Sequence, residues 1–242
     1  MNKITSVWEI GENAKKFLDC ERGAVPGTEM QFEIIRHIAR EWCVTPSSIL
    51  DLGCGDGILG RFLLQNFPSA SGVFVDFSDA MLEAARSSLG DNQNAVLLKA
   101  DFSSPEWLGS ITSHRPFDIV VSGFAIHHQP DERKRELYSE IYSLLSPGGV
   151  FLNLEHVASE TPAVEKLFEE FYIDRLHDFR LKSDPGTSRE AAANIYRNRP
   201  DKHEDKPASV GGQCMWLREI GFDDVDCYFK VFEIALFGGR KY

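Results

Sequence analysis

Three aspartates, each placed near the end of a short apolar run, are the residues best suited to hold a polar ligand. Asp51 lies at the end of Ile49–Leu52, directly before the glycine-rich turn GCGDG. Asp76 ends VFVD, and Asp101 follows LLKA. Glycines let the backbone turn sharply and approach a ligand without a Cβ in the way. Ligands of open α/β sheets bind at the carboxyl ends of parallel strands, so this spacing predicts a nucleotide-type cradle.

Asp76 is the sharpest of these candidates. A carboxylate roughly 20 residues past the glycine turn can accept hydrogen bonds from both hydroxyls of a ribose. The alternative is an acid that merely favours the N-terminus of the following helix through the helix dipole.

The elements that must position these residues alternate along the chain. We expect strands at 49–52, 73–75, 96–98, 117–121 and 150–154, and helices over 58–67, 78–89 and 131–145, the last closed by Pro147-Gly148-Gly149. Strands separated by helices imply right-handed crossovers and a parallel sheet. Two more strands are expected within 222–237, with the last pair antiparallel, after a helix over 209–220.

Composition excludes several classes of protein. Hydrophobic residues make up 43% and charged residues 26% of the 242 residues, and no apolar run reaches the ~20 residues of a membrane span. Five scattered cysteines without a C-x-x-C pair indicate reduced thiols, which predicts a cytoplasmic protein. The net charge, 26 − 37 = −11, makes nucleic acid an unlikely partner.

The glycine spacing distinguishes between two kinds of nucleotide site. The dinucleotide fingerprint G-x-G-x-x-G needs a glycine at position 58, where this chain has Ile58, and the turn here is G-x-G-x-G. ILDLGCGDG, the acid ending the second strand, Asp101, DIVVSGFAIHH and LLSPGGVF follow one another in order. In these motifs the stretch of roughly 47–156 resembles the class I S-adenosylmethionine (SAM) dependent methyltransferases, in particular the small-molecule group that includes the ubiquinone and menaquinone methylases.

The resemblance implies a Rossmann-like, doubly wound α/β fold with a seven-stranded, mostly parallel sheet whose last strand is antiparallel. We expect a single domain, 1–242. Its parts would be an N-terminal helical cap at 1–45, the SAM-binding core at 46–157, a helical substrate-cap insertion at 158–208, and a C-terminal helix with strands at 209–242. A homodimer is compatible with such a chain.

The resemblance also implies SAM as the cofactor and assigns residues to it. Asp101 would bond the adenine amino group, with Phe102 supplying a backbone amide, while Phe77 and Met81 lie near the adenine. Ser122 to Ala125 would follow the methionine moiety. The cofactor-binding set is Asp51, Gly53, Cys54, Gly55, Gly57, Asp76, Phe77, Met81, Asp101, Phe102, Ser122, Gly123 and Ala125. Core packing remains the alternative for Met81, and Cys54 has no base or positive setting that would make it a nucleophile.

His127 and His128 are implied to face the substrate, and we take them as candidate catalytic residues for proton transfer. The alternative is that they cap the next helix or close the pocket. Glu155 and His156, after the fifth strand, are further candidates. We expect no metal, because neighbouring histidines rarely converge on one ion without other ligands. Substrate specificity should come from the cap regions, through Trp8, Phe17, Phe32, Phe171, Tyr172, Arg175, His177, Tyr196, Arg197 and Arg199.

We therefore predict a methyltransferase that moves a methyl group from SAM to a small-molecule acceptor by in-line displacement. The tail from His203 to Lys241 resembles a bacterial subgroup related to the tRNA carboxymethyluridine enzymes. This keeps open a carboxy-SAM synthase, in which Arg197 or Arg199 would hold the extra carboxylate, and a tRNA-modifying relative. A non-catalytic SAM-binding regulator also remains open. An NAD-dependent reductase is disfavoured by Ile58 and by the late antiparallel strands.

Overall fold

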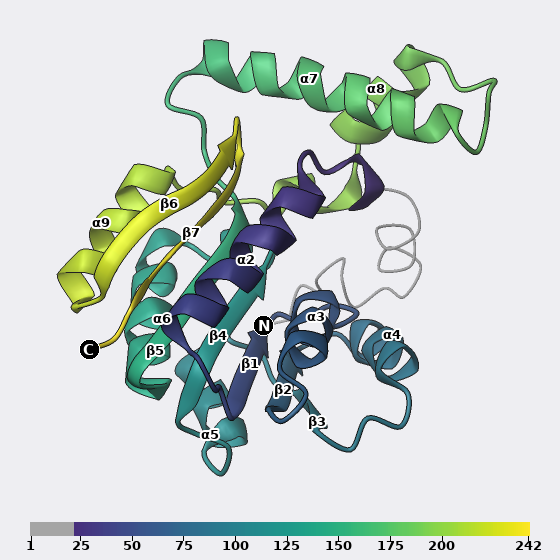
Figure 1. Cartoon of the computed structure of the whole chain (residues 1–242). Coiled ribbons are helices and arrows are strands. Elements are labelled where there is room, and N and C mark those ends of the chain that lie inside the picture. Colours follow the sequence, from purple (N-terminus) through teal and green to yellow (C-terminus); the bar gives the residue numbers. More distant parts are fainter. Residues whose placement is uncertain (1–21) are drawn as a thin grey trace, which may run out of the picture.

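A seven-stranded sheet forms the centre of the protein (Figure 1). The structure, a computed structural model, describes residues 22–242. The strands are β1 (Ser48–Leu52), β2 (Ser71–Asp76), β3 (Ala95–Lys99), β4 (Phe117–Gly123), β5 (Leu145–His156), β6 (Asp223–Val231) and β7 (Ile234–Arg240). Their order is β3-β2-β1-β4-β5-β7-β6, and β7 is antiparallel to both of its neighbours while the other pairs are parallel. The expected Rossmann-like sheet with an antiparallel last strand is confirmed.

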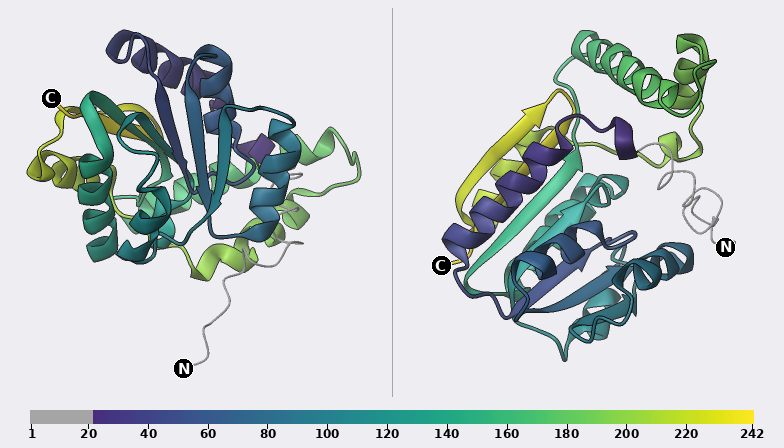
Figure 2. Two further views of the ribbon diagram at one scale, coloured as in Figure 1. Left: turned by 90° about the horizontal axis from the view of Figure 1, so that it is seen from below. Right: turned by 45° about the vertical axis from the view of Figure 1, so that its right-hand side comes forward.

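Helices cover both faces of this sheet. The longer ones are α2 (Thr28–Trp42), α3 (Ile58–Asn66), α4 (Asp79–Leu89), α6 (Asp131–Leu144), α7 (Pro162–Leu181), α8 (Arg189–Arg197) and α9 (Val210–Ile220). The shorter ones are η3 (Arg22–Ala24), η4 (Pro105–Trp107), α5 (Leu108–Ile111), η5 (Ile126–His128) and η6 (Pro200–His203). Side chains of α2, α3 and α4 pack on one face, and those of α5, α6 and α9 on the other. Helix α2 lies beside β5 and β6 and contacts both strands, as the right-hand view of Figure 2 shows.

The strands read as continuous apolar runs because both of their faces are buried. In β1, Ile49 packs with α2 and α3, while its neighbour Leu50 packs into the opposite core. Successive side chains of a strand point to opposite faces, so a strand covered by helices on both sides needs an apolar residue at every position. Polar residues within such strands are then the exceptions that require a function or a partner.

The end of α6 differs from the expectation. The helix was expected to run to 145 and the next strand to begin at 150, but α6 ends at Leu144 and β5 begins at Leu145. Leu145 pairs with Phe117 and Val150 pairs with Ile119, so the Pro-Gly-Gly segment forms an irregularity within β5. Lys241 exchanges backbone hydrogen bonds with Gly148 and Gly149, which keeps this segment attached to the sheet rather than in a free turn.

The charged region after β5 forms a separate helical layer. Helices α7 and α8 contact each other and lie beyond one end of the sheet, apart from the two layers that cover its faces (Figure 1). The side chain of Thr161 caps the first turn of α7, and that of Ser188 caps α8, so each helix begins at a side-chain acceptor. Across residues 22–242, none of the helices combines the length and the apolar character that a bilayer crossing requires.

We expect the fold to tolerate substitution of Gly53 poorly. Its φ is +68°, and a Cβ added there would lie 2.3 Å from the Cβ of Ala125. Gly53→Ala should lower the free energy of unfolding by about 2–4 kcal/mol, which adds the cost of left-handed backbone to that of overpacking. Urea unfolding measures the change.

Gly148→Ala is the matched control, because Gly148 has a φ of +82° but nothing within 4 Å of an added Cβ. It should cost only the backbone term, about 1–2 kcal/mol. Equal losses in the two variants would show that the contact with Ala125 is unimportant.

Candidate functional site

The glycine turn after β1 has the backbone geometry that its sequence predicts. Gly53, Gly55 and Gly57 have φ values of +68°, +56° and +77°. The carbonyl of Val75 accepts hydrogen bonds from the amides of Gly53 (2.8 Å) and Cys54 (2.9 Å), which ties the turn to β2. A Cβ added at Gly55 would meet only the sulfur of Met81, at 3.9 Å. The backbone of the turn is therefore open on the side that faces the cavity described below.

Asp51 and Asp76 hold the turn between them. An oxygen of the buried Asp51 carboxylate accepts from the amide of Gly60, in the first turn of α3, at 2.8 Å. The two oxygens of Asp76 accept from the amides of Gly55 and Ser78, both at 2.9 Å. Burial raises the pKa of Asp76, although these backbone amides oppose the shift. Asp76 is 6% exposed and joins two loops, so its carboxylate also contributes to the fold.

Most of the candidate cofactor residues surround one cavity of about 540 Å³. The sequence-predicted residues at its wall are Asp51, Gly53, Cys54, Gly55, Asp76, Phe77, Met81, Asp101, Phe102, Gly123, Ala125, His127 and His128. They come from the carboxyl ends of β1, β2 and β4 and from the loop after β3, so the topology gathers them at one edge of the sheet. Asp101 is exposed and accepts from the amide of Ser103 at 2.9 Å.

Two candidates are not at the cavity wall. The hydroxyl of Ser122 is fully buried and donates to the carbonyl of Leu52 at 2.7 Å, so it joins β4 to β1. Gly57 precedes α3 and packs against Phe74 and Ala85. Cys54 is at the wall, but burial raises the pKa of its thiol well above the ordinary value. This agrees with a packing role for Cys54.

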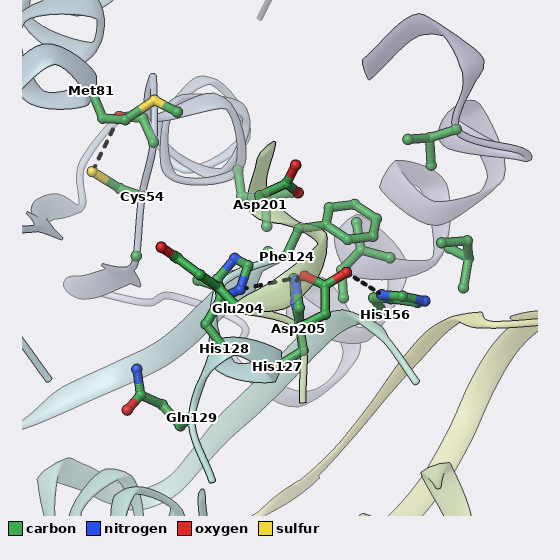
Figure 3. A pocket seen from close by; sticks show the side chains of 18 of the residues that line it. Cys54, Met81, Phe124, His127, His128, Gln129, His156, Asp201, Glu204 and Asp205 are labelled. Carbon is green, nitrogen blue, oxygen red and sulfur yellow. Dashed lines mark hydrogen bonds and ion pairs between the residues drawn. The ribbon is translucent and has the colours of Figure 1, made fainter. Parts of the chain in front are cut away.

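At the other end of the cavity, histidines and carboxylates form a cluster. Nδ1 of His127 lies 2.6 Å from one oxygen of Glu155, and the amide of His127 donates to the other at 3.0 Å. Nε2 of His127 is 3.4 Å from Oδ1 of Asp205, and Nδ1 of His128 is 3.6 Å from the same oxygen. His156 lies 3.9 Å from the second oxygen of Asp205. Figure 3 shows the Asp205 carboxylate between the rings of His127 and His156.

The cluster gives its members unlike protonation states. Burial disfavours a charge on His127, yet Glu155 and Asp205 raise its pKa to about 9. Burial and the charge of His127 lower the pKa of His128 well below its ordinary value. Burial opposes the charge of Asp205 too, but His127 and Arg199 lower its pKa to about 2. These opposite shifts favour the charge on His127 and a neutral ring on His128.

The cap supplies an aromatic wall next to this cluster. Phe168 lies 6.1 Å from the ring of His156 and 5.7 Å from that of Tyr172, which is 5.1 Å from Tyr196. The guanidinium of Arg199 lies 5.1 Å from the centroid of the Tyr196 ring. All of these side chains border the cavity.

The cap candidates from the sequence divide into two groups. Phe32, Tyr172, Tyr196 and Arg199 are at the cavity wall, whereas Phe171, Arg175, His177 and Arg197 are not. Arg197 is directed at Glu169 and Glu170 on the outer surface of α7. Trp8 and Phe17 lie outside the described residues.

Sequence reasoning missed Asp205 and Glu233. Asp205 lies in the polar run NRPDKHEDKP, 78 positions after His127, and nothing in that run separates it from Asp201 or Glu204. Glu233 follows β6 and lies 3.0 Å from Nε2 of His156. Only the burial of these acids, which depends on the folded cap, distinguishes them from surface charges.

Comparison with known proteins agrees with the geometry. Residues 49–149 match the methyltransferase domain family. A carboxy-S-adenosyl-L-methionine synthase of Geobacter sp. (strain M21) is 26% identical over 230 residues, covering 90% of this chain and 86% of that protein. Residues 49–149 therefore form a methyltransferase domain, and the similarities together support a class I SAM-dependent methyltransferase. As in the rest of this class, its cofactor is SAM.

Other relatives of this methyltransferase are similar over less of their length. A malonyl-[acyl-carrier protein] O-methyltransferase of Ilyobacter polytropus is 30% identical over 102 residues, which is 42% of this chain and 35% of that protein. An O-methyltransferase family protein from Burkholderia thailandensis has the same fold, with a TM-score of 0.62 at 14% identity. That match covers 88% of this chain, which spans only 56% of the solved chain.

Arg199 should contribute to stability because its ion pairs are sheltered. Its side chain is 12% exposed and pairs with Asp201 and with Asp205, which is 8% exposed. We expect Arg199→Met to lower the free energy of unfolding by roughly 2–3 kcal/mol, since it leaves the buried Asp205 without its guanidinium partner. Denaturant unfolding at pH 7 measures the loss.

Arg189→Met is the matched control. Arg189 also makes two ion pairs, with Glu170 and Asp174, but is 45% exposed. Exposed pairs contribute little, so this variant should lose at most about 1 kcal/mol. If both variants lost the same amount, burial would not be the source of the effect.

Proposed function

We propose that the protein transfers the methyl group of SAM to a small-molecule acceptor by in-line displacement within the 540 Å³ cavity. The observation that supports this most strongly is the continuity of that cavity. One space runs from the glycine turn and Asp76 to the histidine cluster and the aromatic side chains of the cap. Cofactor and acceptor would thus share one cavity.

The cofactor would occupy the end at the glycine turn. Asp76 already accepts two backbone amides, and its oxygens retain lone pairs for the ribose hydroxyls. The open face of Gly55 leaves room for the ligand beside Met81. Phe77 and Phe102 would contact the adenine, and Asp101 would accept from its amino group. Gly123 and Ala125 would follow the methionine moiety.

SAM supplies a strongly electrophilic methyl group, so the protein has mainly to align the acceptor and keep the site dry. Alignment of two reacting groups can lower a barrier by roughly 7–11 kcal/mol. Phe124, which has a φ of +53°, is fixed between the cofactor residues Gly123 and Ala125 by a hydrogen bond from its amide to Leu154. Non-glycine residues in this conformation persist only where the surroundings hold them, and they are common at ligand sites.

The cap favours an acceptor with a flat apolar body. Phe168, Tyr172 and Tyr196 offer ring faces, and the charge of Arg199 is already balanced by Asp201 and Asp205. Helices α7 and α8, within the expected 158–208 insertion, would then act as the acceptor cap. A polar group of the acceptor would lie at His127 and His128, two of the three described histidines that line the cavity.

A second reaction deserves a test because of one observation. The carboxy-SAM synthase of Geobacter matches 90% of the chain, whereas the O-methyltransferase of Ilyobacter matches only 42%. If this chain carried out the synthase reaction or used its product, the cofactor that co-purifies should be carboxy-SAM. If our proposal is right, mass spectrometry of the ligand released from freshly purified protein should show SAM or S-adenosylhomocysteine. Finding carboxy-SAM would overturn it.

Methyl transfer itself is measured with labelled SAM and a panel of small aromatic hydroxy and amino compounds. We expect formation of S-adenosylhomocysteine to depend on the acceptor. A protein that binds SAM tightly but turns over no member of a broad panel would favour the regulatory alternative.

The expected cytoplasmic location stays part of the proposal. It is supported by Cys43, Cys54, Cys214 and Cys227, which are unpaired thiols.

Asp76 gives the most direct test of the cofactor site. Asp76→Ala should weaken SAM binding roughly tenfold to several-hundredfold, since hydrogen bonds to a charged group contribute ~1.5–3 kcal/mol each. Asp76→Asn keeps an acceptor oxygen and should fall in between. Isothermal titration calorimetry with SAM measures both. Thermal unfolding of each variant is recorded first, because the carboxylate also holds Gly55 and Ser78.

Asp91→Ala is the control, since Asp91 is exposed after α4 and away from the cavity. It should leave SAM affinity unchanged. Asp76→Ala with wild-type affinity and a native circular dichroism spectrum would contradict the assignment of Asp76 to the ribose.

A further inference from the structure

Three side chains of the histidine cluster bring ligating atoms together at the cavity wall. One ligand atom from each of His127, His128 and Asp205 lies within 4.8 Å of the other two. The two histidines come from η5, and Asp205 comes from the segment after η6. We expected no metal here because two adjacent histidines lacked a further ligand. The fold supplies that ligand from far along the chain.

The spacing of these atoms fits a common metal ion. Oδ1 of Asp205 is 3.4 Å from Nε2 of His127 and 3.6 Å from Nδ1 of His128. In a tetrahedral zinc site with bonds of about 2.0–2.1 Å, neighbouring ligand atoms lie about 3.3 Å apart. Oδ1 of Asp205 is buried and lies beside both histidine rings, but neither contact has the geometry of a good hydrogen bond. Buried polar atoms nearly always have a close partner, and a metal ion would be a closer partner for this oxygen than either ring nitrogen.

The surroundings orient the ligands as they do in known metal sites. A metal-binding histidine usually gives its other ring nitrogen to a carboxylate. Glu155 occupies Nδ1 of His127 at 2.6 Å, which leaves Nε2 directed at Asp205. Arg199 binds the second oxygen of Asp205 and so leaves Oδ1 to the histidines. The amide of Lys206 donates to the carbonyl of His127 at 2.9 Å, which fixes the Asp205 segment beside η5.

The charge of the cluster also favours a cation. Glu155 and Glu233 are 0% and 5% exposed, and the Asp205 side chain is 8% exposed. Of these three carboxylates, Asp205 pairs with a permanently charged side chain, that of Arg199, while Glu155 and Glu233 face histidines. Buried charges require compensation. A divalent ion bound at Nε2 would replace the proton that His127 otherwise carries, and would compensate the carboxylates in place of the imidazolium.

We propose that His127, His128 and Asp205 bind one divalent transition-metal ion, with Glu155 as the positioning residue of His127 and with open coordination positions facing the cavity. Two imidazole nitrogens and one carboxylate suit zinc, iron or cobalt rather than magnesium, which prefers oxygen ligands in an octahedron. Metal binding itself is independent of methyl transfer. Its role rests on the proposed function: the ion would take a hydroxyl, carboxylate or amine of the acceptor and hold it beside the aromatic wall.

Metal binding is tested with protein treated with EDTA and then freed of the chelator. Titration with Zn²⁺ against a chromogenic chelator should show one equivalent bound per chain. Titration with Co²⁺ should produce visible absorption bands of a low-coordinate nitrogen and oxygen site, a readout independent of activity. Mg²⁺ at the same concentrations should not compete.

His128→Ala and Asp205→Asn should each abolish the stoichiometric site, while His37→Ala should keep it. His37 is exposed on α2 and remote from the cavity, so it controls for surface binding to any histidine. Glu155→Gln should weaken Zn²⁺ binding by roughly 10–100-fold, the usual effect of changing a group that orients a ligand. Asp205→Asn also changes the ion pair with Arg199 and could therefore unfold the protein. In that case the result for His128→Ala decides the question.

SAM titrations on the same samples separate this proposal from the proposed function. Folded wild-type protein that binds SAM but takes up no Zn²⁺ or Co²⁺ would overturn the metal site and leave the methyltransferase proposal intact. Binding that survives in His128→Ala, or that disappears in His37→Ala, would also overturn it. Stoichiometric metal binding without SAM binding would support the metal site and refute the cofactor site.

Discussion

Buried carboxylates at the carboxyl ends of parallel strands are the constraint on which the rest of this structure depends. Asp51, Asp76 and Glu155 are all nearly inaccessible to water, and an ionised carboxylate can be buried only where donors surround it. Each accepts hydrogen bonds from backbone amides of the loop or helix that follows a strand: Gly60 for Asp51, Gly55 and Ser78 for Asp76, and His127 for Glu155. The carboxylates therefore determine the loop conformations, and the loops form the cavity.

This constraint explains which parts of the site could be predicted from the sequence. Asp51 and Asp76 lie within five residues of glycines or of a helix cap, so their role is a local pattern that a single sequence contains. Ser122 fits the same pattern by position, but its hydroxyl points to Leu52 across the sheet, because a strand residue can face either way. Asp205 lies in an ordinary polar run, and only its contact with His127 and Arg199 reveals its function.

The fold was more predictable than the site for a related reason. Apolar runs of β1 to β5 and the helices between them carry periodic signals, and a parallel order with right-handed crossovers then leaves few topologies. The boundary that failed, at Leu145, depends on long-range pairing with Phe117 and Lys241. Local propensity contains no information about such partners, and glycine and proline there indicate a turn whether or not the backbone stays attached to the sheet.

Asp205 also connects the two halves of the site. Arg199 and Asp205 belong to the segment between α8 and α9, while His127 and Glu155 belong to the sheet and its loops, and each is in contact with the next. Only a few arrangements of these side chains pair every buried charge. Each buried charge left unpaired would cost roughly several kcal/mol in a nonpolar environment. These charged contacts help to fix the cap on the core, together with the contacts of Phe168 and Phe171 with the ring of Phe232. The residues that fix this position, Arg199, Asp205 and His127, also line the cavity, so the placement of the cap and the shape of the site depend on the same contacts.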